Sequence, residues 1–397
     1  MTTRRWWQKP QLRRDEEAHQ ERKVTWLELF YDLVFVVVIA ELSHSLAEHV
    51  SVAGVAAFAL LFVPVWWVWI GGTFYNDRFE ADDLSHRLFT LLQMLPVGAM
   101  AVFAHDGLGE TSVGFALSYA AARTLITYLW WRGGLHDPEA RPLTNRYGVG
   151  FGVSVLLFVA SVFVPAPARF ILWGVGLLFD LVTPLTTLGV QRRLPRLTTS
   201  HLPERFGLFV IIVLGESVVG VVQGVAERES LTWLSTLPAG LGMALAFGMW
   251  WLYFDFIARR RAKQGVWWFS FWTYLHLPFV MATTAIGAGV LNVVSNESTE
   301  LPDEGRWLLV GAVAAALITL GVLELILHRD QGEPTDRRIS SPLKIVAGLA
   351  AIALGYWGTG LGPTTLLSLL MLLVIVNMAY GAVVWFRQAT VELLEPG

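Results

Sequence analysis

Twelve apolar runs, each close to the length of a membrane-spanning helix, constrain the fold of this chain more than any other feature. A helix of about 20 apolar residues crosses the roughly 30 Å of hydrocarbon in a bilayer. Backbone groups cannot stay unpaired in lipid, so such runs must form helices. The runs cover residues 26–47, 52–73, 85–104, 112–131, 148–164, 169–189, 206–225, 233–257, 267–290, 307–327, 343–360 and 363–386. The sequence therefore predicts an all-α, polytopic membrane protein of about twelve transmembrane helices. Eleven is the alternative, because only a Gly-Pro turn separates the last two runs.

Charged residues are few and lie mainly between these runs. They make up 15% of the chain, whereas soluble domains contain about 25%. Alternate loops on the cytoplasmic side of a membrane protein carry an excess of Lys and Arg. If the amino terminus is cytoplasmic, nearly all of the 29 basic residues fall on that side, and the outer loops hold only Arg169, Arg228 and Arg306. We therefore expect both termini to be cytoplasmic.

Composition and motifs limit the classes of function. The chain has no cysteine, which excludes disulfides, thiolate metal sites and thiol catalysis. It contains no phosphate-binding loop, no zinc-protease motif and no serine-hydrolase motif. We therefore predict no catalytic residue, no metal site and no cofactor. The expected partners are membrane lipids and an unknown small solute or ion, with no nucleic acid, and a homo-oligomer is left open.

Three similarities recur in the same order along the chain and predict two six-helix repeats. The runs that begin near Glu28 and Glu204 each read Glu-x-Phe and carry a second glutamate twelve or thirteen residues later. Trp-rich and Leu-Pro strings follow in the next two runs of each half. Because six is even, both halves enter the membrane from the same side, as in transporters with parallel repeats. Chance recurrence in a Trp-rich apolar chain is the alternative, and the tryptophans themselves are expected mainly at membrane interfaces.

The repeats divide the chain into four parts. Residues 1–24 form a basic cytoplasmic tail that is expected to bind anionic lipid headgroups. Residues 25–190 form the first six-helix half, residues 191–390 form the second half, and residues 391–397 form a second cytoplasmic tail.

Acidic residues inside the runs are the main functional candidates. A carboxylate at membrane depth costs about 2.5–3.5 kcal/mol on insertion scales, so it is rarely kept without a use or a partner. Glu41 and Glu216 lie deepest, and a desolvated glutamate can bind and release a proton or cation. A structural pair with Arg123, the one basic residue deep within a run, is the alternative for both.

Two further residues are primary ion- or proton-binding candidates, as gate or relay groups. Asp32 lies four residues after Glu28, so the two share a helix face near the cytoplasmic end. A cap at the cytoplasmic end of the helix, or a salt bridge of this face to Arg22, Lys23 or Arg205, is the alternative. His276 could relay protons, or it could be a hydrogen-bonded packing residue. The secondary candidates are Glu28, His44, Arg123, Asp180 and Glu204.

Two strings in the chain resemble signatures of the bacterial low temperature requirement protein A family. Residues 28–36 read ELFYDLVFV, and residues 204–217 read ERFGLFVIIVLGES. The resemblance implies a multi-pass protein of the bacterial cytoplasmic (inner) membrane, in a family without an established biochemical activity. A fainter likeness is to potassium channels built from six-helix units that begin with a Phe-Ser-Asp signature. The corresponding string here is Phe30-Tyr31-Asp32. The second half has no aspartate at the matching place, since it reads Phe206-Gly207-Leu208.

The leading functional hypothesis is a secondary transporter, coupled to protons or another cation, in which Glu41 and Glu216 bind the coupling ion. A cation channel is the first alternative. A membrane-embedded enzyme or lipid-handling protein is the second, and enzymatic activity is the less favoured hypothesis.

Overall fold

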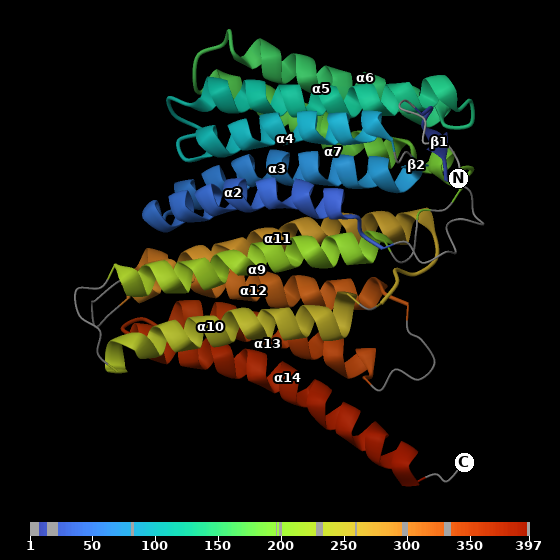
Figure 1. Ribbon diagram of the computed structural model, residues 1–397. Coiled ribbons are helices and arrows are strands. Elements are labelled where there is room, and N and C mark those ends of the chain that lie inside the picture. Colours follow the sequence, from blue (N-terminus) through green and yellow to red (C-terminus); the bar gives the residue numbers. More distant parts are fainter. Residues whose placement is uncertain are drawn as a thin grey trace. The chain divides into compact units, whose positions relative to one another are not determined.

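The computed structural model describes residues 8–13, 23–80, 83–195, 197, 201–227, 233–258, 260–295, 301–328 and 335–394. Most of the predicted tail 1–24, including Arg22, and the last three residues of the predicted tail 391–397 lie outside this part of the chain. Within it, twelve long helices follow one another (Figure 1): α2 (Trp26–Glu48), α3 (Val52–Arg78), α4 (Leu84–Ala104), α5 (Ser112–His136), α6 (Arg141–Ser161), α7 (Ala168–Thr186), α9 (His201–Ala226), α10 (Trp233–Tyr253), α11 (Val266–Ser295), α12 (Asp303–Ile326), α13 (Arg337–Trp357) and α14 (Pro363–Leu394).

The prediction of an all-helical protein with many apolar spans is confirmed. Eleven helices of the described chain are long and apolar enough to cross a membrane. The remaining long helix, α5, carries Ser, Tyr, Thr and Trp residues together with Arg123, and these lower its hydropathy. The short elements are α8 (Leu188–Gln191), a π-helix η1 (Phe254–Ala258) and two strands, β1 (Gln11–Leu12) and β2 (Phe79–Glu80).

The chain forms two compact units, which we describe separately. Unit 1 comprises Met1–Ser45 and Ala56–Phe206, and unit 2 comprises Leu46–Val55 and Gly207–Gly397. Helices α2, α3 and α9 each contribute residues to both units. The predicted six-helix halves divide the chain between residues 190 and 191 and remain a prediction.

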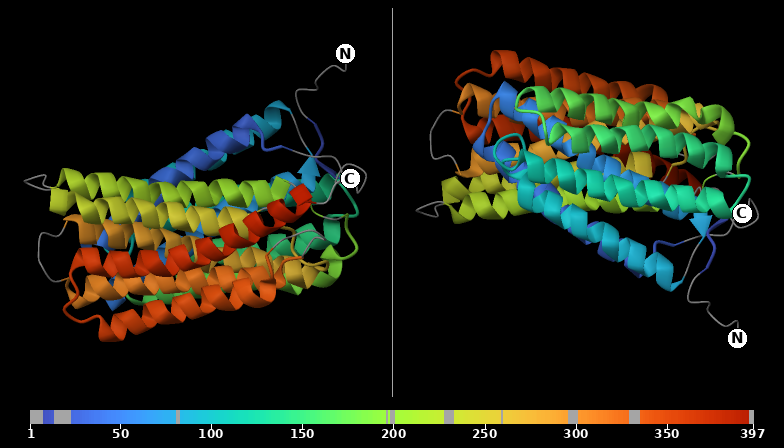
Figure 2. Two further views of the ribbon diagram at one scale, coloured as in Figure 1. Left: turned by 90° about the horizontal axis from the view of Figure 1, so that it is seen from below. Right: turned by 90° about the horizontal axis from the view of Figure 1, so that it is seen from above.

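In unit 1, consecutive helices pack as neighbours: α4 against α5, α5 against α6, and α6 against α7 (Figures 1 and 2). Aromatic rings fill the space between them. Trp173 of α7 stacks on Phe115 of α5 and on Phe158 of α6, with ring centroids 5.7 and 5.4 Å apart. Trp66 and Trp69 of α3 are also fully buried. These three tryptophans therefore pack between helices, whereas the tryptophans were expected mainly at membrane interfaces.

The short strands tie the start of the chain to one end of unit 1. Strand β1 pairs with β2 in antiparallel fashion, with Leu12 opposite Phe79. The carboxylate of Asp83 caps α4 by accepting from the backbone N–H of His86 at 2.9 Å. Arg132 of α5 donates to the backbone carbonyl of Gln8 at 2.8 Å. Residues 8–13, expected to be part of a cytoplasmic tail, are thus fixed against the ends of α3, α4 and α5.

In unit 2, helix α12 packs between α11 and α13, and α14 lies against α10 (Figures 1 and 2). Helices α9 and α11 approach each other closely at Gly287. A Cβ atom at this glycine would lie 3.0 Å from the backbone nitrogen of Ser217 and 3.1 Å from the carbonyl carbon of Glu216. The absence of a side chain at Gly287 therefore allows α11 to pack directly against the backbone that carries Glu216.

Candidate functional site

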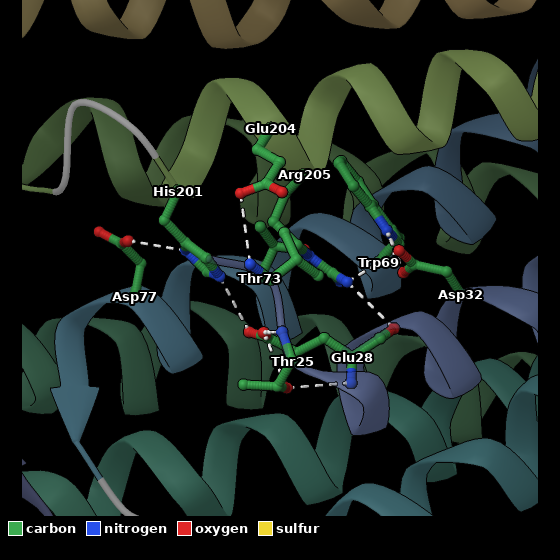
Figure 3. Close-up of polar contacts among 10 residues, drawn as sticks. Thr25, Glu28, Asp32, Trp69, Thr73, Asp77, His201, Glu204 and Arg205 are labelled. Atoms are coloured by element: carbon green, nitrogen blue, oxygen red, sulfur yellow. Dashed lines mark hydrogen bonds and ion pairs between the residues drawn. The ribbon is translucent and has the colours of Figure 1, made fainter. Parts of the chain in front are cut away.

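Polar faces of three helices meet in unit 1. Each face has residues four apart, which places their side chains one above another on a helix. We call the resulting set the acid–histidine cluster (Figure 3): Glu28 and Asp32 from α2, Trp69, Thr73 and Asp77 from α3, and His201 and Arg205 from α9. The five ionisable members of this set are all buried.

Arg205 holds one side of the cluster together. Its Nη1 donates to Oδ2 of Asp32 at 2.7 Å and to the backbone carbonyl of Glu28 at 3.0 Å. Its Nη2 donates to Oγ1 of Thr73 at 3.3 Å. The second oxygen of Asp32 accepts from the indole N–H of Trp69 at 3.0 Å. The salt bridge from Asp32 to Arg205, one of the alternatives from the sequence, is confirmed.

His201 lies between two carboxylates on the other side of the cluster (Figure 3). Its Nδ1 is 3.0 Å from Oδ1 of Asp77, and its Nε2 is 3.1 Å from Oε1 of Glu28. A carboxylate only accepts hydrogen bonds, and a neutral imidazole donates from only one of its nitrogens. Both contacts can therefore be hydrogen bonds only if the three groups share two protons. Either the imidazole is doubly protonated or one carboxylate carries a proton.

Glu28 also closes the start of its own helix. Its Oε2 accepts from the backbone nitrogen of Thr25 at 2.9 Å and from the Thr25 hydroxyl at 3.0 Å. The Thr25 hydroxyl in turn accepts from the backbone nitrogen of Glu28 at 3.3 Å. This reciprocal arrangement is a capping box, which the Thr-x-x-Glu spacing produces. The cap fixes one carboxylate oxygen of Glu28 and leaves the other directed at His201.

The charges of the cluster favour proton uptake. Among the described residues of the cluster, three carboxylates, those of Glu28, Asp32 and Asp77, lie around one guanidinium and one imidazole. Carboxylates that share a buried site repel each other when all are ionised, and binding a proton relieves this repulsion. The arrangement can therefore take up a proton and release it at the cost of one hydrogen bond to His201.

Five members of the cluster were not among the sequence candidates: Trp69, Thr73, Asp77, His201 and Arg205, the last of which was named only as a possible salt-bridge partner. The predicted second helix ended at residue 73, whereas α3 continues to Arg78, so Asp77 is helical rather than in a loop. Its position four residues after Thr73 was a usable signal, as was the position of His201 four residues before Arg205. The apolar runs left Asp77 and His201 out of the predicted helices, because polar residues end such runs.

A second buried ion pair lies deeper along the helices of unit 1. Nη2 of Arg123 is 2.5 Å from Oδ1 of Asp180, and both side chains are fully buried. Asp180 also accepts from the hydroxyls of Tyr119 and Ser154, the latter at 2.6 Å. The guanidinium lies 4.2 Å from the centre of the Phe151 ring. The alternative that Arg123 pairs with Glu41 or Glu216 is therefore wrong, because Asp180 is its partner.

Glu41 and His44 lie near the end of α2 in a more open environment. Oε2 of Glu41 is 3.9 Å from Nδ1 of His105, and the two side chains are 43% and 46% exposed. The ring of His44 lies 6.2 Å from that of His105. Because His105 directly follows α4, Glu41 is level with the end of that helix.

The candidates on α9 and α11 have contrasting surroundings. In unit 2, Glu216 is 5% exposed, and its carboxylate has no hydrogen-bond or ion-pair partner among the described residues.

His276, also in unit 2, is bonded at both ring nitrogens. Nδ1 donates to the carbonyl of Trp272 at 2.7 Å, and Nε2 accepts from the hydroxyl of Tyr253 at 3.1 Å. This is the geometry of a packing histidine. Glu204, in unit 1, is exposed and accepts from the backbone nitrogen of Val24 at 3.3 Å.

In the part of the chain that the structure describes, no group of three or more His, Asp or Glu side chains is placed to hold a metal ion.

Comparison with known proteins identifies relatives of this chain. Residues 23–379 match the family model of the bacterial low temperature requirement A protein. An uncharacterized protein of Rhizobium meliloti (strain 1021) is 30% identical over 297 residues, which cover 68% of this chain and 70% of that protein. The family match includes every residue of the acid–histidine cluster.

Proposed function

This chain belongs to the bacterial low temperature requirement A protein family, and we propose that it is a proton-coupled secondary transporter that uses the acid–histidine cluster of unit 1. The proposal places the protein in the bacterial cytoplasmic membrane with both termini in the cytoplasm and with two six-helix repeats. It also gives the protein a small solute or ion as substrate, with membrane lipids as its surroundings.

The position of His201 carries this proposal. One imidazole contacts the carboxylates of Asp77 and Glu28 at 3.0 and 3.1 Å, and all three groups are buried. Burial removes the water that would otherwise stabilise each charge, so the protonation state of the trio decides whether its contacts attract or repel. The contacts of such a group change from attractive to repulsive when it loses one proton, so the group is suited to bind and release a coupling proton.

The cluster also links proton binding to helix packing. His201 and Arg205 belong to α9, and their partners belong to α2 and α3. Loss of a proton from the trio replaces one hydrogen bond to His201 by a repulsive contact, which weakens the attachment of α9 to one of these helices. A ligand shifts a conformational equilibrium when it binds two states with different affinity. The proton is such a ligand here. Its binding shifts the equilibrium between the closed and open states of a gate formed by the Asp32–Arg205 pair.

Glu216 is the second proposed ion site. Its burial without a partner among the described residues suits a group that binds the coupling proton or cation during the cycle. Glu41 and His276 remain proposals of lower rank, because Glu41 is nearly half exposed and His276 is bonded at both nitrogens.

Flux measured in proteoliposomes tests the proposal. Purified protein is reconstituted with a pH-sensitive dye inside, and gradients of H⁺, K⁺ and Na⁺ are imposed in turn. The proposal expects a protein-dependent pH signal that Glu216→Gln removes, at a rate typical of a carrier. A much faster ion flux without counter-transport would show a channel instead. If correctly inserted protein gave no pH signal under any of the gradients, the proposal would be overturned in favour of lipid handling or enzymatic chemistry.

A further inference from the structure

Several buried side chains of unit 1 carry polar atoms that make no hydrogen bond to any described residue. Among these atoms are Nε of Arg205, the hydroxyl of Tyr31, Oε1 of Gln93, and Nη1 and Nε of Arg123. The orientation of the Gln93 amide is fixed, because its Nε2 donates to the carbonyl of Phe89 at 3.2 Å. Buried polar atoms normally have a partner, which is often an ordered water molecule.

Most of these atoms lie beside a pair of glycines on α3. A Cβ atom at Gly72 would be 3.2 Å from the Tyr31 hydroxyl and 3.4 Å from Oε1 of Gln93. A Cβ atom at Gly71 would be 3.0 Å from Nη1 of Arg123. Side chains from α2, α4 and α5 therefore bring unpartnered polar atoms to adjacent positions of one helix. Only glycine allows this approach without crowding.

These atoms connect the acid–histidine cluster with the deeper ion pair. Tyr31 precedes Asp32 in sequence and lies within electrostatic range of Arg205, Asp32 and Arg123. Gly72 precedes Thr73, which accepts from Arg205. Arg123 lies thirteen residues before the end of α5 at His136, or about 20 Å along that helix. The unpartnered atoms thus extend from the cluster toward the middle of the helices.

We propose that unit 1 binds a short chain of water molecules beside Gly71 and Gly72, held by Tyr31, Gln93 and Arg123, and that this chain extends the proton path of the acid–histidine cluster inward. The role of the water chain in the proton path rests on the proposed function, whereas the binding of the water molecules does not.

The donors and acceptors suit water. Arg123 offers N–H donors only, Gln93 Oε1 only accepts, and the Tyr31 hydroxyl does both. A bound water molecule makes two to four hydrogen bonds and can satisfy a donor and an acceptor at once. A hydroxyl between water molecules can pass a proton by accepting one and donating another. Tyr31 is the member of this set that can do so.

The path ends at Arg123. The guanidinium is permanently charged, and fixed positive charges exclude protons from water-filled passages. Beyond it, Tyr119 and Asp180 are bonded to each other, and the stacked rings of Phe115, Phe158 and Trp173 fill the space between α5, α6 and α7. A water chain of this length hydrates one side of unit 1 without opening a continuous route across it.

Radiolytic hydroxyl-radical labelling of the intact protein tests the water chain directly, because radicals form from water that touches a side chain. Tyr31 is expected to be labelled several-fold faster than Tyr119, which is also buried but donates its hydroxyl to Asp180. Equal and slow labelling of the two tyrosines would overturn the proposal.

Two pairs of variants test the role of the water in proton movement. Tyr31→Phe removes an unpartnered hydroxyl and should reduce proton flux without lowering thermal stability, whereas Tyr119→Phe removes a bonded one and should lower stability. Gly72→Ala places a methyl group against the Tyr31 hydroxyl and should reduce flux. The control is Gly152→Ala on α6, where a Cβ atom meets no atom within 4 Å, and flux should be unchanged.

The outcomes separate this inference from the proposed function. Fast labelling of Tyr31 in a protein that moves no protons would keep the water site and overturn the transport role. Proton flux that depends on His201 but not on Tyr31 or Gly72 would keep the transport role and overturn the extended path.

Discussion

Nη1 of Arg205 lies 2.7 Å from Oδ2 of Asp32, although 173 residues separate the two in sequence. Asp32 belongs to the string at residues 28–36, and Arg205 belongs to the string at residues 204–217, which are the two strings that resemble the family signatures. Their contact explains why both strings carry charged residues at the start of an apolar helix. Each supplies the partner that the other needs in a buried position.

Replacing Arg205 should strongly destabilise unit 1. The variant Arg205→Met leaves the Asp32 carboxylate buried without its cation, and breaking a buried ion pair from one side costs about 3–5 kcal/mol. The measurement is the thermal unfolding of the purified protein in detergent. The double variant Asp32→Asn/Arg205→Met should recover part of the loss, because no buried charge is left alone. A double variant less stable than Arg205→Met would contradict this account.

Asp180 should matter for stability more than its hydroxyl partners do. Asp180→Ala leaves the fully buried Arg123 guanidinium uncompensated, with an expected loss of about 3–5 kcal/mol. Ser154→Ala removes a single hydrogen bond to the same carboxylate, with an expected loss of about 1.5–3 kcal/mol. Unfolding in detergent compares the two variants. Equal effects would show that the ion pair adds nothing beyond an ordinary hydrogen bond.

The sequence predicted the helices well and the acid–histidine cluster only in part. Long apolar runs are local signals, so the spans that start at Trp26 and Val52 could be located from composition alone. The partner of a buried charge depends on packing between distant segments, which is why Arg123 had several candidate partners and the structure was needed to identify Asp180. His201 and Asp77 were missed because both lie just outside the apolar runs.

Asp83 should make the attachment of the amino-terminal segment sensitive to acid. Partial burial disfavours ionisation of this carboxyl, but hydrogen bonds from Gln8, His86 and Ser85 outweigh it and lower the pKa of Asp83 below its ordinary value of 3.8. A carboxyl whose pKa is lower in the folded state contributes stability above its unfolded pKa and loses it as the pH falls through the folded value.

The variant Asp83→Ala should therefore be less stable than the wild type by about 1 kcal/mol near neutral pH, the usual effect of losing a helix cap. This difference should shrink as the pH falls below the ordinary aspartate value. Thermal unfolding of both proteins across a pH series measures it. A difference that stays constant down to the lowest pH would show that ionised Asp83 is not what holds Gln8 and the start of α4.

Glu216 and Glu41 should respond differently to neutralisation. Glu216→Gln removes a buried carboxyl that has no partner among the described residues, so stability should be unchanged while gradient-driven flux is lost. Glu41→Gln affects a half-exposed side chain, and exposed ion pairs contribute about 0–1 kcal/mol. Its effect on flux should be the smaller of the two. Glu110→Gln, at an exposed position between α4 and α5, is the control for the loss of one negative charge.

Proton uptake by reconstituted protein with and without His201 tests the central claim most directly. His201→Gln removes the imidazole that joins Glu28 and Asp77, and His136→Gln makes the same change at an exposed position of unit 1. With both variants inserted to the wild-type level, the account predicts that proton flux is lost in His201→Gln and unchanged in His136→Gln. Wild-type flux in His201→Gln would contradict it, because the acid–histidine cluster could then not be the group that carries the proton.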